Sequence, residues 1–108
     1  MSGFDDREKG FEAKFSHDEE TKFRIRARRD KLLGRWAAQQ FGIPAAEAEA
    51  YANELVASDV GQPRDDFLPE KVVADAKARG KEFDIHAVRR EMRRLAEIAR
   101  TDIMQGRT

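Results

Sequence analysis

The chain has 108 residues, of which 21 are basic, 21 are acidic and none is cysteine, so its formal net charge is zero. A chain of this length forms one domain with a modest core. The balanced charge excludes a net field that would draw the whole molecule onto nucleic acid or an anionic membrane. The missing thiols exclude disulfides, thiolate metal sites and cysteine nucleophiles. With an acidic start and no long apolar run, the composition favours a soluble protein on the cytoplasmic side of a membrane.

The first twenty residues are rich in charge yet contain three phenylalanines, Phe4, Phe11 and Phe15. Their spacings of seven and four place them on one side of an ideal helix, where they form a narrow apolar seam. Gly10 and the like-charged pair Glu8 and Glu12 make such a helix marginal in water. Two interpretations remain open at this point. The segment folds back onto the rest of the chain, or it is flexible or partly helical and becomes ordered in a groove of another protein.

The next stretch, residues 21–42, predicts an amphipathic helix that ends at Gly42. Its apolar face carries Ile25, Leu32, Leu33 and Trp36, and we expect Trp36 to be a core residue. The other side is dense in arginine. This basic run suits a helix that contacts nucleic acid phosphates, but the zero net charge favours a solvated face or one that docks on an acidic protein surface. The arginines concerned are Arg24, Arg26, Arg28 and Arg29.

Three further helices follow in chain order. Pro44 stands at the predicted first position of a helix that continues to about Asp59, and the loop VGQPRDD comes after it. The next helix runs over about 67–79 and ends at Gly80. The last is predicted from Ile85 to Met104 with Asp84 as its N-cap. The expected fold is therefore an all-α four-helix bundle over residues 21–108, without strands. Its apolar stripes are Ala48, Tyr51, Ala52, Leu55 and Val56; Leu68, Val72, Val73 and Ala76; and Ile85, Val88, Met92, Leu95 and Ala99, widened by Ala96 and Ile103.

Residues that could support catalysis or metal binding are few. His17 and His86 are the histidines, and no glycine-rich phosphate loop or serine nucleophile motif is present. His17 with Asp18, Glu19 and Glu20 suggests a metal site, but adjacent helical residues point in different directions. We favour ion pairs one turn apart, from Asp18 to Lys22 and from Glu20 to Arg24. We therefore expect no enzyme activity, no metal and no cofactor.

Several segments together carry a family resemblance. FDDREKGFEAKF near the start is followed by FRIRARRDKLLGRWAA, then by EAEAYANELVASD and an arginine-rich amphipathic helix. In this order and spacing they resemble the zeta subunit of alphaproteobacterial F-type ATP synthases, a natural inhibitor of the hydrolytic direction of the enzyme. The resemblance spans essentially the whole chain. Short charged patterns of this kind are weak singly and specific as an ordered set.

The resemblance implies a four-helix bundle whose mobile N-terminal segment, residues 1–20, inserts into a catalytic interface and blocks rotation. The implied partners are the catalytic and rotor subunits of the ATP synthase head. The implied location is cytoplasmic and peripheral to the inner membrane, and the free protein is expected to be a monomer. A nucleic-acid-binding protein or a structural helical adaptor is the alternative. The inhibitory role falls on the matching residues Phe4, Asp5, Asp6, Arg7, Glu8, Phe11, Glu12, Lys14 and Phe15.

Overall fold

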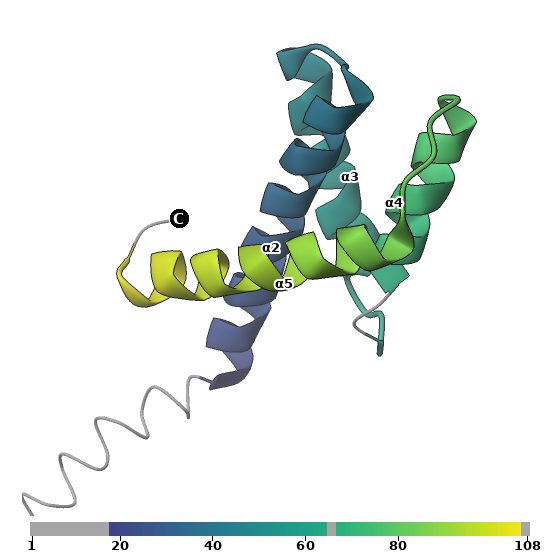
Figure 1. Ribbon diagram of the computed structural model, residues 1–108. Coiled ribbons are helices and arrows are strands. Elements are labelled where there is room, and N and C mark those ends of the chain that lie inside the picture. The colour runs from purple at the N-terminus through teal and green to yellow at the C-terminus, as the bar shows by residue number, and fades with distance from the viewer. Residues whose placement is uncertain (1–17, 65–66, 107–108) are drawn as a thin grey trace, which may run out of the picture.

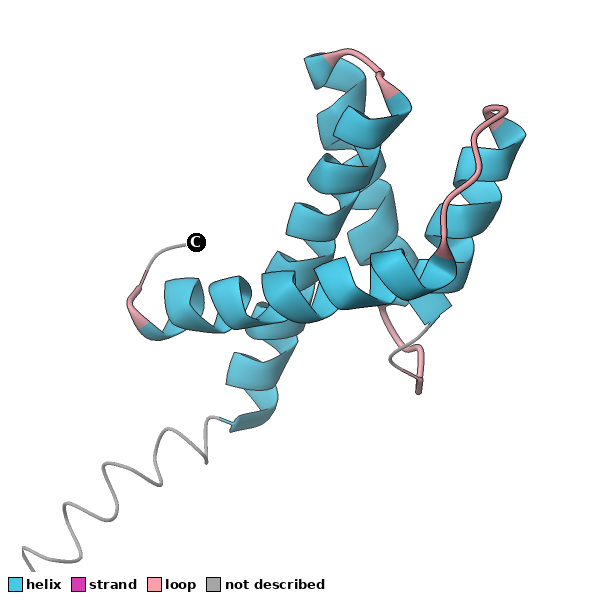
Figure 2. Ribbon diagram, viewed as in Figure 1, coloured by secondary structure: helices cyan, strands magenta, loops and turns pink. Residues whose placement is uncertain are grey.

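The computed structural model describes residues 18–64 and 67–106. These residues form the helices α2 (Asp18–Phe41), α3 (Ala45–Asp59), α4 (Phe67–Ala78) and α5 (Ile85–Met104). The parts of the chain that the structure describes contain helices, turns and loops but no strand (Figure 2). The predicted all-α four-helix fold is confirmed. Only the start of the first predicted helix differs clearly, because α2 begins at Asp18 and so crosses the predicted boundary between residues 20 and 21.

α2 is the element around which the others are arranged. Both α3 and α5 pack against it, and α4 packs mainly against α5. α5 crosses α2 steeply, so that its N-terminal half reaches α4 while its C-terminal half projects beyond α2 on the other side (Figure 1). This crossing leaves part of the α2 surface uncovered between α3 and the projecting end of α5.

The helix ends follow the predicted stop and start signals. Gly42 and Gly80 both have positive φ, 79° and 77°, a conformation that a side chain would strain. The Asp84 side chain accepts a hydrogen bond from the backbone N–H of His86 at 3.0 Å, which confirms it as the N-cap of α5. The prediction for Pro44 is wrong by one residue. It lies in extended conformation before α3 begins, and its carbonyl accepts the first bond of that helix from Ala48.

The core joins the predicted stripes of the four helices. Leu33, Leu55, Leu68 and Val72 are fully buried, and Trp36 packs partly buried against them with its ring 6.0 Å from that of Phe83. The remaining buried members are Ala37, Ala38, Phe41, Tyr51, Ala76, Val88, Met92 and Leu95. Within residues 18–64 and 67–106, every member of this core lies at or beyond position 33.

Gly34 allows the closest approach of two helices. A Cβ atom placed on it would lie 2.5 Å from the Cα of Ala52, which is closer than carbon atoms can approach. α2 and α3 therefore pack backbone to backbone at this point. The segment FRIRARRDKLLGRWAA, one of those that carry the family resemblance, contains this glycine. Its place in the helix has a packing reason despite the unfavourable helix propensity of glycine.

Candidate functional site

The predicted inhibitory residues lie outside the described part of the chain. This holds for Phe4, Asp5, Asp6, Arg7, Glu8, Phe11, Glu12, Lys14 and Phe15, and also for His17. The structure therefore does not test their roles. It does describe the helix into which that segment leads and the surface around the start of that helix.

The exposed side of α2 begins with an ion pair and an aromatic residue. The Arg24 guanidinium contacts the Glu20 carboxylate at 3.3 Å, which confirms the predicted pair one turn apart. Both side chains are well exposed, so the pair adds little to stability. Phe23 beside them is 57% exposed, a large apolar surface for a helix in solution.

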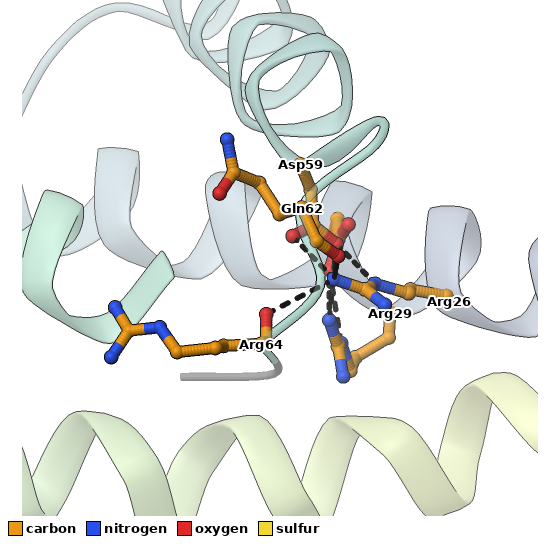
Figure 3. A network of polar contacts seen from close by, with 6 residues as sticks. Arg26, Arg29, Asp59, Gln62 and Arg64 are labelled. Carbon is orange, nitrogen blue, oxygen red and sulfur yellow. Dashed lines mark hydrogen bonds and ion pairs between the residues drawn. The ribbon is translucent and has the colours of Figure 1, made fainter. Parts of the chain in front are cut away.

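A second group of α2 residues forms a buried polar network with the end of α3 (Figure 3). The Arg26 guanidinium donates to both oxygens of Asp59, at 2.8 Å to Oδ1, and to the backbone carbonyls of Gln62 and Arg64. The guanidinium of Arg29 donates to Asp59 at 3.3 Å. These bonds fasten the last residue of α3 and the loop after it to the N-terminal half of α2.

Asp30 completes this network from the next position of α2. The residue is 1% exposed, and its carboxyl group accepts from the Nε of Arg29 at 2.9 Å and is hydrogen-bonded to Asp59. Burial, together with the neighbouring Asp59, raises the pKa of Asp30 to about 8. Burial by itself would raise the pKa of Asp59, but hydrogen bonds from Arg26 and Asp30 outweigh this effect and lower it. The pair therefore holds one proton at neutral pH, on Asp30, while Asp59 stays ionised.

The predicted solvated basic face is wrong for most of its arginines. Arg26 and Arg29 are held by Asp59, and the Arg28 guanidinium contacts Asp102 of α5 at 3.2 Å. These guanidinium groups join α2 to α3 and α5 instead of facing a partner. Arg24 alone of the four is mostly exposed, with 60% of its side chain accessible. The basis for a phosphate-binding helix is correspondingly weakened.

Two hollows lie on either side of Phe23. One is a small cavity of about 80 Å³, where Phe23 and Val60 flank the buried Asp30 and Asp59. The other is a shallow groove of about 500 Å³ along the uncovered side of α2, between α3 and the end of α5. Its apolar part consists of Phe23, Ala27, Val56 and Ile103, and its polar part of Arg24, Arg28, Lys31, Arg35 and Asn53. We call this second hollow the α2 groove.

The sequence reasoning missed both the Asp30–Asp59 pair and the α2 groove. One signal was available for the pair. Asp59 is the last residue of its helix, where the negative end of the helix dipole disfavours an acid, so its presence there points to a strong partner. No comparable signal exists for the groove, because it depends on how α5 crosses α2.

No metal-binding arrangement is found among residues 18–64 and 67–106. This part of the chain holds no cluster of three acids, histidines or cysteines placed to bind a metal. Two arginines of α5 are bound to acids of the same helix, Arg94 to Glu91 and Arg100 to Glu97. Of the helices described, none is long and apolar enough to cross a membrane.

In the part of the chain described, these features define a small helical protein whose buried ion pairs fasten α2 to α3 and whose Arg28–Asp102 pair fastens α2 to α5. A sequence model of the family described as ATPase inhibitor subunit zeta matches residues 1–102, so the chain belongs to that family. It is accordingly an inhibitor of ATP hydrolysis, as the resemblance implied. Searches of curated proteins and of solved structures each found no match.

Proposed function

We propose that the chain inhibits the F-type ATP synthase by inserting residues 1–20 as a wedge into a catalytic interface of the rotary head, while residues 21–108 remain a folded body outside it. The observation that carries this proposal is the family match, which covers the N-terminal segment together with the helical domain. The core found among the described residues supports this proposal. Its buried apolar members, from Leu33 to Leu95, pack against one another, so the helical domain has an apolar core of its own.

The phenylalanine seam supplies the apolar part of the proposed contact. Phe4, Phe11 and Phe15 would enter a groove of the partner, and each contributes about 1.5–3 kcal/mol on burial. The surrounding charges lie at the rim and fix the orientation of the segment. They are Asp5, Asp6, Arg7, Glu8, Glu12 and Lys14. The wedge acts mechanically, by stopping a closing interface, and requires neither a catalytic group nor a cofactor of its own.

The proposed partners are the catalytic and rotor subunits of the head, since a wedge that stops rotation must touch both. The protein is then cytoplasmic and reaches the inner membrane only through the synthase. We propose a monomer as the free form. A single segment that enters a single interface needs no second copy.

The test replaces Phe11 and Phe15 together by alanine. The loss of two buried aromatic side chains should weaken binding by about 3–6 kcal/mol, a factor of roughly a hundred or more in affinity. The control is Ala13→Ser, which changes the opposite side of the same predicted helix. Each variant is titrated against the ATPase activity of the isolated enzyme head, and circular dichroism of the free protein checks that the helical domain is intact.

Inhibition by the double variant equal to that of the parent would contradict the wedge. Unfolding of the double variant would place the phenylalanines in the core instead. The nucleic-acid alternative is tested with the parent protein and duplex DNA without the enzyme, over a series of salt concentrations. Tight binding that weakens steeply with salt would support it.

A further inference from the structure

The α2 groove is the side of α2 that neither α3 nor α5 covers, whereas these two helices pack against its other sides. α3 and α5 both pack on α2, but within the described residues they do not pack against each other, and the groove opens between them. Phe23 lies at the end of the groove nearest the start of α2, and Arg35 lies at the far end. In Figure 1 the C-terminal half of α5 projects on the side away from α4, and Ile103 of this half lines the groove.

The charges along the α2 groove leave a small basic excess. Its four basic side chains are Arg24, Arg28, Lys31 and Arg35. Their carboxylate partners number three, because Lys31 and Arg35 share Glu49, while Arg24 binds Glu20 and Arg28 binds Asp102. The pairs with Glu20 and Glu49 are at least one-third exposed on both sides, so a further acid can join them at little cost.

From these observations we infer that the α2 groove is an intramolecular docking site for residues 3–15 of the same chain. The docked segment lies antiparallel to α2. Its residues Phe11 and Phe15 then contact the apolar part of the groove at Phe23, Ala27 and Ile103. This arrangement would give the segment a second binding site, which competes with the ATP synthase. The docking is independent of the proposed function, whereas its consequence for inhibition rests on that function.

The length of the segment matches that of the groove. Residues 3–15 and residues 23–35 are both stretches of thirteen, and as helices both measure about 20 Å. Ser16 and His17 separate Phe15 from the first residue of α2, and helix connections of two residues occur between antiparallel neighbours. In the antiparallel arrangement the phenylalanines nearest α2 reach the apolar end of the groove.

The charges of the segment complement those of the groove. Residues 1–17 contain the four acids Asp5, Asp6, Glu8 and Glu12, and the three bases Arg7, Lys9 and Lys14. The antiparallel arrangement places Glu12 near Arg24, and it places Asp5 and Asp6 near Arg28 and Lys31. A segment with one excess acid thus lies on a groove with one excess base, and a charged partner that is tethered nearby needs no high concentration to bind.

The test uses the full-length chain without the enzyme. Because the chain has no cysteine, a single nitroxide label can be attached through Ala13→Cys or Ser2→Cys, both of which lie off the phenylalanine seam. Paramagnetic broadening is read on backbone amides distant in sequence. Docking should broaden Asn53 and Ile103 with the label at position 13, and Lys31 and Arg35 with the label at position 2, while Lys77 on α4 stays sharp.

The matched variants are Phe23→Ser, inside the groove, and Ile98→Ser, which is partly exposed on α5 but does not line the groove. Phe23→Ser should remove the broadening and Ile98→Ser should keep it. Unchanged broadening with Phe23→Ser, or broadening absent from the start, overturns the docking. Broadening that passes from labelled to unlabelled chains in a mixed sample also overturns it, since the occupant is then a second copy.

The inhibition assay adds an independent readout. A docked segment lowers the apparent affinity for the enzyme by the fraction of free chains, so Phe23→Ser should lower the concentration needed for half-inhibition at least about twofold. Weaker inhibition with Phe23→Ser would assign Phe23 to the contact with the enzyme and would count against the groove as a competing site. Failure of the parent to inhibit at all would refute the proposed function and leave the broadening result standing.

Discussion

The buried pair of Asp30 and Asp59 makes the stability of the protein depend on pH in an unusual direction. We consider the substitution Asp30→Asn. The amide has the shape of a protonated carboxyl group, so it can still donate to Asp59 and accept from Arg29, the bonds that Asp30 makes in the structure. The groups that face Asp30 are Arg29 on its own helix and Asp59 on α3, with Arg26 bound to the same Asp59.

The direction in which stability changes with pH follows from the direction of the pKa change of Asp30. Burial raises the pKa of Asp30 from 3.8 to about 8, so between these values the folded state holds a proton that the unfolded state has lost. Stability must then fall as the pH rises through this window, by about 1.4 kcal/mol per pH unit. From pH 6 to pH 8 this amounts to about 2 kcal/mol, because the slope flattens as the folded-state group ionises. Asp59, with its lowered pKa, stays charged in both states over this range.

The assay is urea unfolding followed by circular dichroism, for the parent and Asp30→Asn, at intervals from pH 5.5 to pH 9. We expect the free energy of unfolding of the parent to decline relative to that of the variant, so that Asp30→Asn is the more stable protein at pH 8.5. All other titrating groups are common to both proteins and cancel in the difference. Parallel curves over the whole range would refute the assignment of a proton to Asp30.

Three further predictions concern the helical domain. Gly34→Ala should destabilise the protein by about 1–3 kcal/mol in urea unfolding, because the new Cβ would meet the backbone of Ala52 even though alanine favours helices. A gain in stability would refute the close approach of α2 and α3. Leu95→Ala removes a side chain that is 5% exposed and should cost about 2–5 kcal/mol in the same assay, and a negligible loss would remove Leu95 from the core. Deletion of residues 1–17 should lower the free energy of unfolding by no more than about 1–2 kcal/mol, and collapse of the helical signal on heating near room temperature would show that the segment belongs to the core.

The helices could be predicted because their signals are local. A stripe such as Val88, Met92, Leu95 and Ala99 repeats at helical spacing, and the stop signals at Gly42 and Gly80 depend on a few neighbouring residues. The interpretation of the arginine run failed for the opposite reason. Whether Arg26 and Arg28 face solvent or an acid depends on where Asp59 and Asp102 lie, 33 and 74 residues away in sequence. No periodicity within α2 contains that information.

The same residues explain why a helix as polar as α2 is held in one place. α2 carries the arginine run, and a helix with such a face has few apolar contacts in its N-terminal half to fix its position. The bonds from Arg26 and Arg29 to Asp59 supply that constraint, together with the contact between Arg28 and Asp102. Loss of Asp59 would remove this buried carboxylate from both Arg26 and Arg29, and removal of one member of a buried ion pair costs more than the pair itself contributes. The network therefore fixes the N-terminal half of α2, from which, under the two proposals, residues 1–17 would reach either the ATP synthase or the α2 groove.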